Sequence, residues 1–76
     1  MKKLEKIFQE VFQDVNINLV EDLVIRDLDT WDSFNQINLV LAVEEAYGVV
    51  ITPGEVESIM TVGDLLDILA SKGCTA

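Results

Sequence analysis

The longest apolar run of the chain, SFNQINLVLAVEEAY at residues 33–47, decides which fold the sequence can form. It begins directly after Asp32 and is followed by Gly48, a residue suited to the left-handed conformation that ends helices. Its apolar residues form a wider stripe than one contact face of a helix needs: Phe34, Ile37, Leu39, Val40, Leu41, Ala42, Val43, Ala46 and Tyr47. We therefore predict a helix over 33–47 that is either central to the fold or exposes part of its apolar surface to a partner.

A second amphipathic helix is predicted over about residues 3–14. Its apolar residues recur at the helical spacing i, i+3, i+4, i+7, i+8, i+11: Leu4, Ile7, Phe8, Val11, Phe12 and Val15. Residues 15–31 lack a sustained period, but Leu19, Leu23, Leu28 and Trp31 are apolar enough to attach this segment to a core. Unstructured connections of this length are uncommon in compact domains and are often functional.

Two helix starts are predicted in the C-terminal third. Thr52 is placed as an N-cap, with Pro53 at the first helical position and Glu55 completing a capping box, so a short helix is expected over about 53–59. The run 61–64 opens the last helix in the same way, over about 62–71. Residues 49–51 have no second strand-like run to pair with and form an extended linker. The expected fold is all-α: one domain over 1–76, a four-helix bundle with three longer helices, one short helix and a long first loop.

Composition narrows the class of protein. Half of the 76 residues are hydrophobic and the net charge is −9, a combination that favours a folded acidic domain over a disordered one. Fourteen acidic residues against five basic ones would repel a phosphate backbone, so nucleic acid is excluded as a partner and basic protein surfaces are favoured. The lone Cys74 fits a reducing compartment, and no apolar run has the length of a signal peptide or a membrane span. We expect a cytoplasmic, monomeric protein that does not span a membrane.

Several kinds of chemistry are excluded by what the chain lacks. It has no histidine, which rules out Ser-His and Cys-His nucleophile pairs and histidine metal sites. The acidic run from Asp27 fails as a calcium loop, because Trp31 would fill the fifth position, Asp32 the place of the required glycine and Asn38 the place of the bidentate carboxylate. We therefore expect neither a metal site nor enzymatic activity.

Ser33 is the residue on which the function depends, and its position alone permits two interpretations. Serine is a preferred N-cap residue, and Gln36 lies three positions later, where it would complete a capping box. A phosphodiester on the same hydroxyl would also be favoured, because it would lie beside the unpaired N–H groups and the positive end of a helix dipole. The first interpretation makes Ser33 a structural cap, and the second makes it an attachment point.

The wider context of Ser33 matches a known family over residues 28–69. Asp32-Ser33-Phe34 is preceded by Trp31 and followed by an aliphatic run that ends in Glu44-Glu45. The β-branched linker and the start Thr61-Val62-Gly63-Asp64 then follow at the matching spacing. The chain resembles the acyl carrier proteins, whose motif is Asp-Ser followed by a large apolar residue.

This resemblance implies a specific modification and a set of partners. A phosphopantetheinyl transferase would attach 4'-phosphopantetheine from coenzyme A to Ser33, and the thiol of the arm would hold an acyl group as a thioester. Asp32, beside its role as a helix cap, would help to position the serine and a metal-bound coenzyme A in the transferase. Acyl-transferring or ketosynthase-type enzymes with basic docking patches would bind a face made of Phe34, Asn35, Ile37, Asn38, Leu41, Glu44 and Glu45. The carrier itself would catalyse none of these steps.

The chain departs from the usual pattern at three positions. Asn35 and Asn38 stand where many fatty-acid-synthesis carriers have acidic residues, and Phe34 replaces the commoner leucine. The two asparagines favour a specialised fatty-acid, lipid or polyketide-like pathway over the housekeeping one, whereas Phe34 still fills an apolar position with a different shape. The predicted core residues could also line a cargo cavity, and the sequence does not separate the two roles: Leu4, Phe8, Phe12, Val40, Val43, Leu65, Leu66 and Leu69. A peptidyl or aminoacyl carrier, and an unmodified helical interaction module, remain as alternatives.

Overall fold

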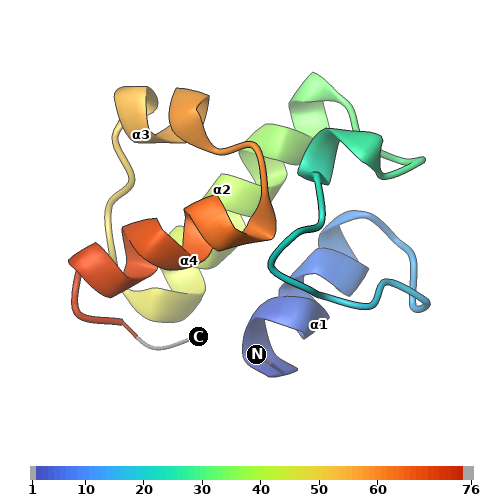
Figure 1. Cartoon of the computed structure of the whole chain (residues 1–76), viewed down its shortest axis with the longest axis horizontal. Helices are drawn as coiled ribbons and strands as arrows, with labels where there is room; N and C mark the ends of the chain where they lie inside the picture. Colours follow the sequence, from blue (N-terminus) through green and yellow to red (C-terminus); the bar gives the residue numbers. More distant parts are fainter. Residues whose placement is uncertain (1, 75–76) are drawn as a thin grey trace.

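The computed structural model describes residues 2–74, and its regular structure is helical (Figure 1). The four α-helices are α1 (Lys2–Val11), α2 (Ser33–Tyr47), α3 (Pro53–Ser58) and α4 (Val62–Ser71), and a short 3₁₀ helix, η1 (Ile25–Asp27), lies in the long first loop. Within the described residues there is no strand, only an isolated antiparallel bridge between Val24 and Thr61. The predicted all-α fold is confirmed, and the helices expected over 33–47 and 62–71 have these bounds in the structure.

The first helix is shorter than the expected range of 3–14, so that prediction is wrong at its C-terminal end. α1 ends at Val11, and Gln13 adopts a left-handed backbone with φ of +52°. The Asp14 carboxylate then accepts a hydrogen bond from the Asn16 backbone at 2.9 Å, which is the local pairing that stabilises a turn against a continued helix. As a result Val15 is 82% exposed and does not extend the buried stripe of α1.

The hydrophobic core is built around α2, which crosses the middle of the molecule between α1 on one side and α3 with α4 on the other (Figure 1). The Phe8 and Phe12 rings pack 5.8 Å apart, centroid to centroid, at the end of α1. Predicted core residues are buried with the exception of Leu66, which packs against the core while partly exposed. The buried set also draws on the connecting segments: Leu4, Phe8, Phe12, Ile17, Leu19, Ile25, Leu39, Val40, Val43, Ile51, Ile59, Val62, Leu65 and Leu69.

The long first loop is fixed to the bundle by hydrogen bonds. The Leu19 backbone N–H donates to the Glu5 carboxylate of α1 at 3.0 Å. At the other end, the Val62 N–H at the start of α4 donates to the Leu23 carbonyl, also at 3.0 Å. Because both attachments are to helices of the core, they fix the position of the loop and therefore the position at which α2 begins.

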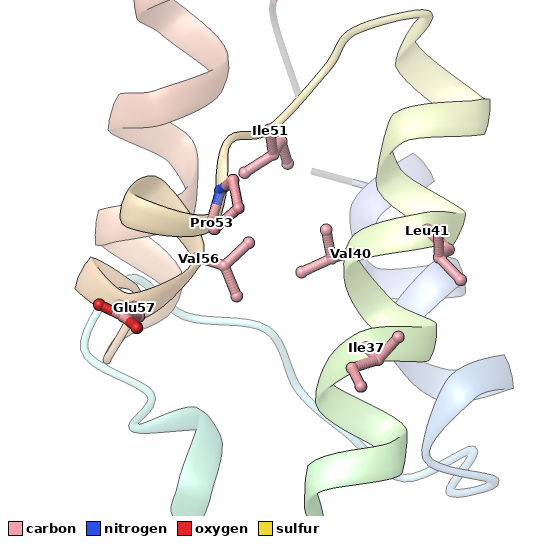
Figure 2. A pocket seen from close by; sticks show the side chains of 7 residues that line it. All are labelled: Ile37, Val40, Leu41, Ile51, Pro53, Val56 and Glu57. Atoms are coloured by element: carbon pink, nitrogen blue, oxygen red, sulfur yellow. The ribbon is translucent and has the colours of Figure 1, made fainter.

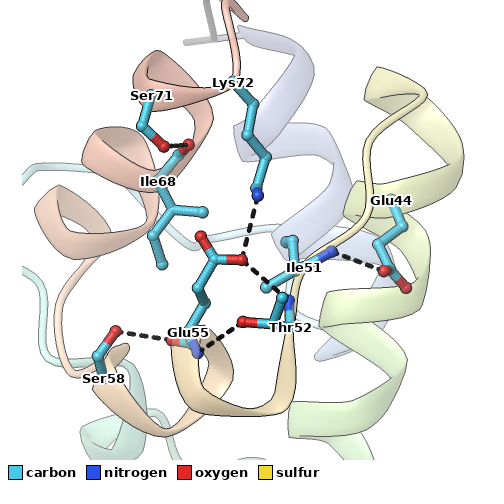
Figure 3. Close-up of polar contacts among 8 residues, drawn as sticks. All are labelled: Glu44, Ile51, Thr52, Glu55, Ser58, Ile68, Ser71 and Lys72. Atoms are coloured by element: carbon cyan, nitrogen blue, oxygen red, sulfur yellow. Dashed lines mark hydrogen bonds and ion pairs between the residues drawn. The ribbon is translucent and has the colours of Figure 1, made fainter.

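The short helix α3 is held through its first turn. Thr52 caps it through the expected capping box, in which the Thr52 hydroxyl accepts from Glu55 N–H at 3.2 Å and the Glu55 carboxylate accepts from Thr52 N–H at 2.9 Å (Figure 3). The same carboxylate forms an ion pair with Lys72 at the end of α4, at 3.1 Å.

No helix within residues 2–74 has the length and apolar character needed to cross a membrane.

Candidate functional site

Ser33 is the first residue of α2 and is exposed, but it does not cap the helix. The N-cap is Asp32, whose backbone is extended and whose Oδ1 accepts a hydrogen bond from the Asn35 N–H at 2.7 Å. The capping box of Ser33 with Gln36, one of the two interpretations of the serine, does not form, because the preceding carboxylate already satisfies the helix donor and Gln36 accepts from the Trp31 indole N–H at 2.9 Å. The Ser33 hydroxyl is left without this structural task.

The segment before Ser33 is tied to both neighbouring helices. Thr30 donates its hydroxyl proton to the Phe12 carbonyl at the end of α1, with an O···O distance of 2.7 Å. Its own carbonyl accepts a hydrogen bond from the Asn35 side-chain amide in the first turn of α2, at 2.8 Å. The bond between Thr30 and Asn35 thus closes a loop that contains Ser33. The Thr30 hydroxyl attaches this loop to the end of α1, and the Asn35 side chain attaches it to α2.

The start of α2 offers backbone N–H groups to an anion on the Ser33 hydroxyl. At a helix start the first N–H groups have no partner within the helix, and here the Asp32 cap satisfies the one of Asn35. The N–H groups of Ser33 and Phe34 remain at the positive end of the α2 dipole. The Arg26 guanidinium lies over the Trp31 ring, 5.5 Å from its centroid.

Three large apolar side chains are exposed on α2 beyond Ser33. Phe34 is 78% exposed, Ile37 57% and Leu41 56%, and they follow one another at about one helical turn. The wide apolar stripe of α2 left two alternatives open, a central helix or a helix with part of its apolar surface exposed. The structure shows both at once, because α2 is central and also partly exposed. Side chains of this size on one face are the ordinary mark of a binding surface.

An apolar groove opens between α2 and α3, with a volume of about 360 Å³ (Figure 2). Val40 of α2 and Val56 of α3 point toward one another across it. Ile37 at one edge follows Ser33 by four residues, which is about 6 Å along the helix axis. A chain attached to Ser33 would therefore reach the groove, which is lined by Ile37, Val40, Leu41, Ile51, Pro53, Val56 and Glu57.

Not all of the acidic and amide residues that were predicted for the docking face on α2 point outward. Glu45 is exposed, whereas Glu44 is half-buried and its Oε2 accepts a hydrogen bond from the Ile51 N–H at 2.9 Å (Figure 3). Glu44 thus fixes the linker that forms one wall of the groove. Asn38 is exposed and donates a long hydrogen bond of 3.4 Å to Oδ1 of Asn35, whose own amide is occupied by Thr30.

No family model matches the chain. Among curated proteins, it is 39% identical over 72 residues to the acyl carrier protein of Syntrophobacter fumaroxidans, in an alignment that covers 95% of this chain and 88% of that protein. The chain belongs to the acyl carrier protein family. It is also 42% identical over 50 residues to the acyl carrier protein of Acidothermus cellulolyticus, which covers 66% of this chain and 58% of that protein.

The fold gives the same answer. The solution structure of the holo acyl carrier protein from Geobacter metallireducens superimposes with a TM-score of 0.85 at 35% identity, over 93% of this chain and 82% of that one. Acyl carrier proteins are carriers and not enzymes, so the expectation that this chain catalyses no reaction is confirmed by its family. Their role implies interaction with the enzymes of acyl synthesis.

The sequence alone did not identify two parts of this carrier's site. The α3 side of the groove is formed by Ile51, Pro53 and Val56, which are distant in sequence from the groove residues of α2 and approach them only in the folded chain. In the sequence, only the apolar Val56 in a short helix indicates this side of the groove. Thr30 gave no signal, because a threonine in a polar loop has no pattern that reveals its bond to the end of α1.

Proposed function

We propose that this acyl carrier protein holds acyl groups as thioesters on a 4'-phosphopantetheine arm attached to Ser33. The observation that carries the proposal is the position of Ser33: exposed, first in α2, directly after the Asp32 cap and one helical turn from an apolar groove. The similarity to a holo acyl carrier protein at 35% identity over most of the chain supports the presence of the arm.

The attachment would be a phosphoryl transfer. The Ser33 Oγ would attack the phosphorus next to the pantetheine in coenzyme A, the phosphoanhydride bond would break, and 3',5'-ADP would leave while the serine proton goes to a base of the transferase. The chain contributes position and charge: the closed loop from Thr30 to Asn35 holds the serine, and the free N–H groups at the start of α2 favour the new phosphodiester anion.

The groove supports an acyl cargo over an aminoacyl one. Six of its seven lining residues are apolar, and the seventh is the Glu57 carboxylate, which lies at one end of the close-up in Figure 2. Apolar surface of this kind gains free energy by burying a hydrocarbon chain and gains little from an ammonium group. The Glu57 carboxylate is the one lining group that would suit the ammonium of an aminoacyl cargo, and the six apolar residues outweigh it.

The partners would dock on the exposed side of α2. Phe34, Ile37 and Leu41 offer apolar contact area, and Glu45 with the overall charge of −9 favours basic patches on a phosphopantetheinyl transferase and on acyl-transferring or ketosynthase-type enzymes. The neutral amide of Asn38 on this face supports a specialised acyl pathway. Within this proposal the carrier is monomeric and works in the cytoplasm.

Intact-mass measurement after incubation with a broad-specificity transferase and coenzyme A tests the attachment. The wild-type protein should gain one phosphopantetheine and Ser33→Ala none. Ser58→Ala and Ser71→Ala are matched controls that should be modified normally, because these hydroxyls donate to the carbonyls of Glu55 at 2.7 Å and Ile68 at 2.6 Å (Figure 3). An unmodified wild-type protein, or a modified Ser33→Ala, would refute the proposal.

A further inference from the structure

The side chain of Asn35 makes contacts on both sides of Ser33. Its Nδ2 donates to the Thr30 carbonyl at 2.8 Å, three residues before the serine. Its Oδ1 faces the amide of Asn38 at 3.4 Å, further along α2. The backbone N–H of the same residue donates to the Asp32 cap at 2.7 Å. One residue therefore connects the loop, the cap and the first turns of the helix.

Thr30 extends this connection into the body of the protein. Its hydroxyl donates to the carbonyl of Phe12, a fully buried residue that follows α1. The path Phe12, Thr30, Asn35 consequently runs from the core to α2 through two hydrogen bonds of 2.7 and 2.8 Å. The four residues 31–34, Ser33 among them, are spanned by the second of these bonds. Both bonds help to fix the position of the serine relative to the core, together with the Asp32 cap and the bond from Trp31 to Gln36.

The bond to Thr30 requires an amide at position 35. A backbone carbonyl only accepts hydrogen bonds, so the group that faces it must be a donor. An ionised aspartate has the same shape as asparagine but carries no donor, and it would place an oxygen against the Thr30 carbonyl oxygen. The asparagine therefore does more than remove a negative charge from the docking face, which is the role that the sequence suggested for it.

We propose that Asn35 is a positioning residue for the modification of Ser33, acting through Thr30. This inference rests on the proposed attachment at Ser33 and specifies what holds the serine for it. Loss of the amide donor loosens the loop, which the Asp32 cap and the bond from the Trp31 indole to Gln36 still attach to α2, so that the hydroxyl is presented to the transferase in a wider range of positions. Since small misplacements of a reacting group lower the rate of a chemical step strongly, the effect falls on kcat.

Steady-state phosphopantetheinylation, followed by intact mass, tests this role with two matched pairs of variants. Asn35→Ala and Asn35→Asp should each lower kcat by about tenfold with the KM for the carrier unchanged. Asn18→Ala and Asn18→Asp make the same changes of volume and charge at an exposed asparagine of the first loop, away from the docking face, and should leave kcat at the wild-type value. Melting temperatures of the four variants establish that each is folded.

A fifth variant checks the path through Thr30. Thr30→Val keeps the shape of the side chain but removes the donor to Phe12, and it should lower kcat without an additive loss when combined with Asn35→Ala. A wild-type kcat in Asn35→Ala would overturn the positioning role. A rise of KM in Asn35→Asp but not in Asn18→Asp, with kcat unchanged in both, would also overturn it and make Asn35 a reader of charge. A wild-type protein that accepts no arm would instead refute the attachment itself.

Discussion

Asp32 combines two roles that a pair of substitutions can separate. Its Oδ1 caps α2 through a 2.7 Å hydrogen bond to Asn35 N–H, and the family resemblance gives its carboxylate a further role in the transferase complex. Asp32→Ala removes both, whereas Asp32→Asn keeps an oxygen acceptor in the same place and removes only the charge. The cap and the charge can therefore be measured apart.

The expected magnitudes follow from the single cap bond. Loss of an N-cap acceptor typically costs about 1 kcal/mol, which corresponds to a fall of about 4–8 °C in melting temperature for a domain of this size. Asp32→Asn retains the cap and loses only the interaction of a charge with the helix dipole, about 0.3–1 kcal/mol at an exposed site. Thermal unfolding followed by far-ultraviolet circular dichroism measures both variants against the wild-type protein.

The rate of Ser33 modification then reports on the charge. We expect Asp32→Asn to be more stable than Asp32→Ala, because it keeps the cap acceptor, but to be modified more slowly than the wild type, because the carboxylate is absent from the transferase complex. A melting temperature for Asp32→Ala equal to that of the wild type would refute the assignment of Asp32 as the cap. Modification of Asp32→Asn at the wild-type rate would show that the cap is its only role.

Two further predictions concern charge. Backbone hydrogen bonds from the N-cap threonines are the main reason that the pKa values of Glu55 and Asp64 are lowered from their ordinary 4.5 and 3.8. Their stabilising effect is complete above those ordinary values and is lost as the pH falls through the lower values of the folded protein. Melting temperatures of Glu55→Gln and Asp64→Asn should consequently approach that of the wild type towards pH 3, and constant differences from pH 7 to pH 3 would contradict this. Glu45→Lys should slow association with a basic partner enzyme at low salt, while Glu10→Lys, at an exposed position of α1, should have little effect. Equal effects of the two substitutions would argue against docking on α2.

Local rules were sufficient for much of the helical framework. Gly48 ends α2 in the left-handed conformation, and Thr52 and Thr61 begin α3 and α4 with capping boxes, all within a few residues of sequence. The end of α1 was missed because Gln13 adopts a positive φ that its residue type does not announce. The order of the first loop depends on non-local bonds such as the one from Leu19 N–H to Glu5, which no local pattern contains.

The parts of the candidate site that belong to a local sequence motif were predictable. The parts that depend on tertiary contacts were not. Asp32 and Ser33 are adjacent residues of the same capping class, and only the backbone of the folded chain shows that the aspartate is the cap. Glu44 was expected on the docking face, but its bond to Ile51 N–H turns it toward the linker. The amide of Asn35 was interpreted as a missing charge, because its bond to Thr30 is visible only in the structure.

The most direct test of the central claim locates an acyl group on the protein. A broad-specificity transferase is given an acyl-coenzyme A, and the product is digested and examined by fragmentation mass spectrometry before and after treatment with hydroxylamine. We predict one acyl-phosphopantetheine on Ser33, with the acyl group released by hydroxylamine because it is held as a thioester. A protein that remains unmodified, or one that carries the group on Ser58 or Ser71, would contradict this prediction.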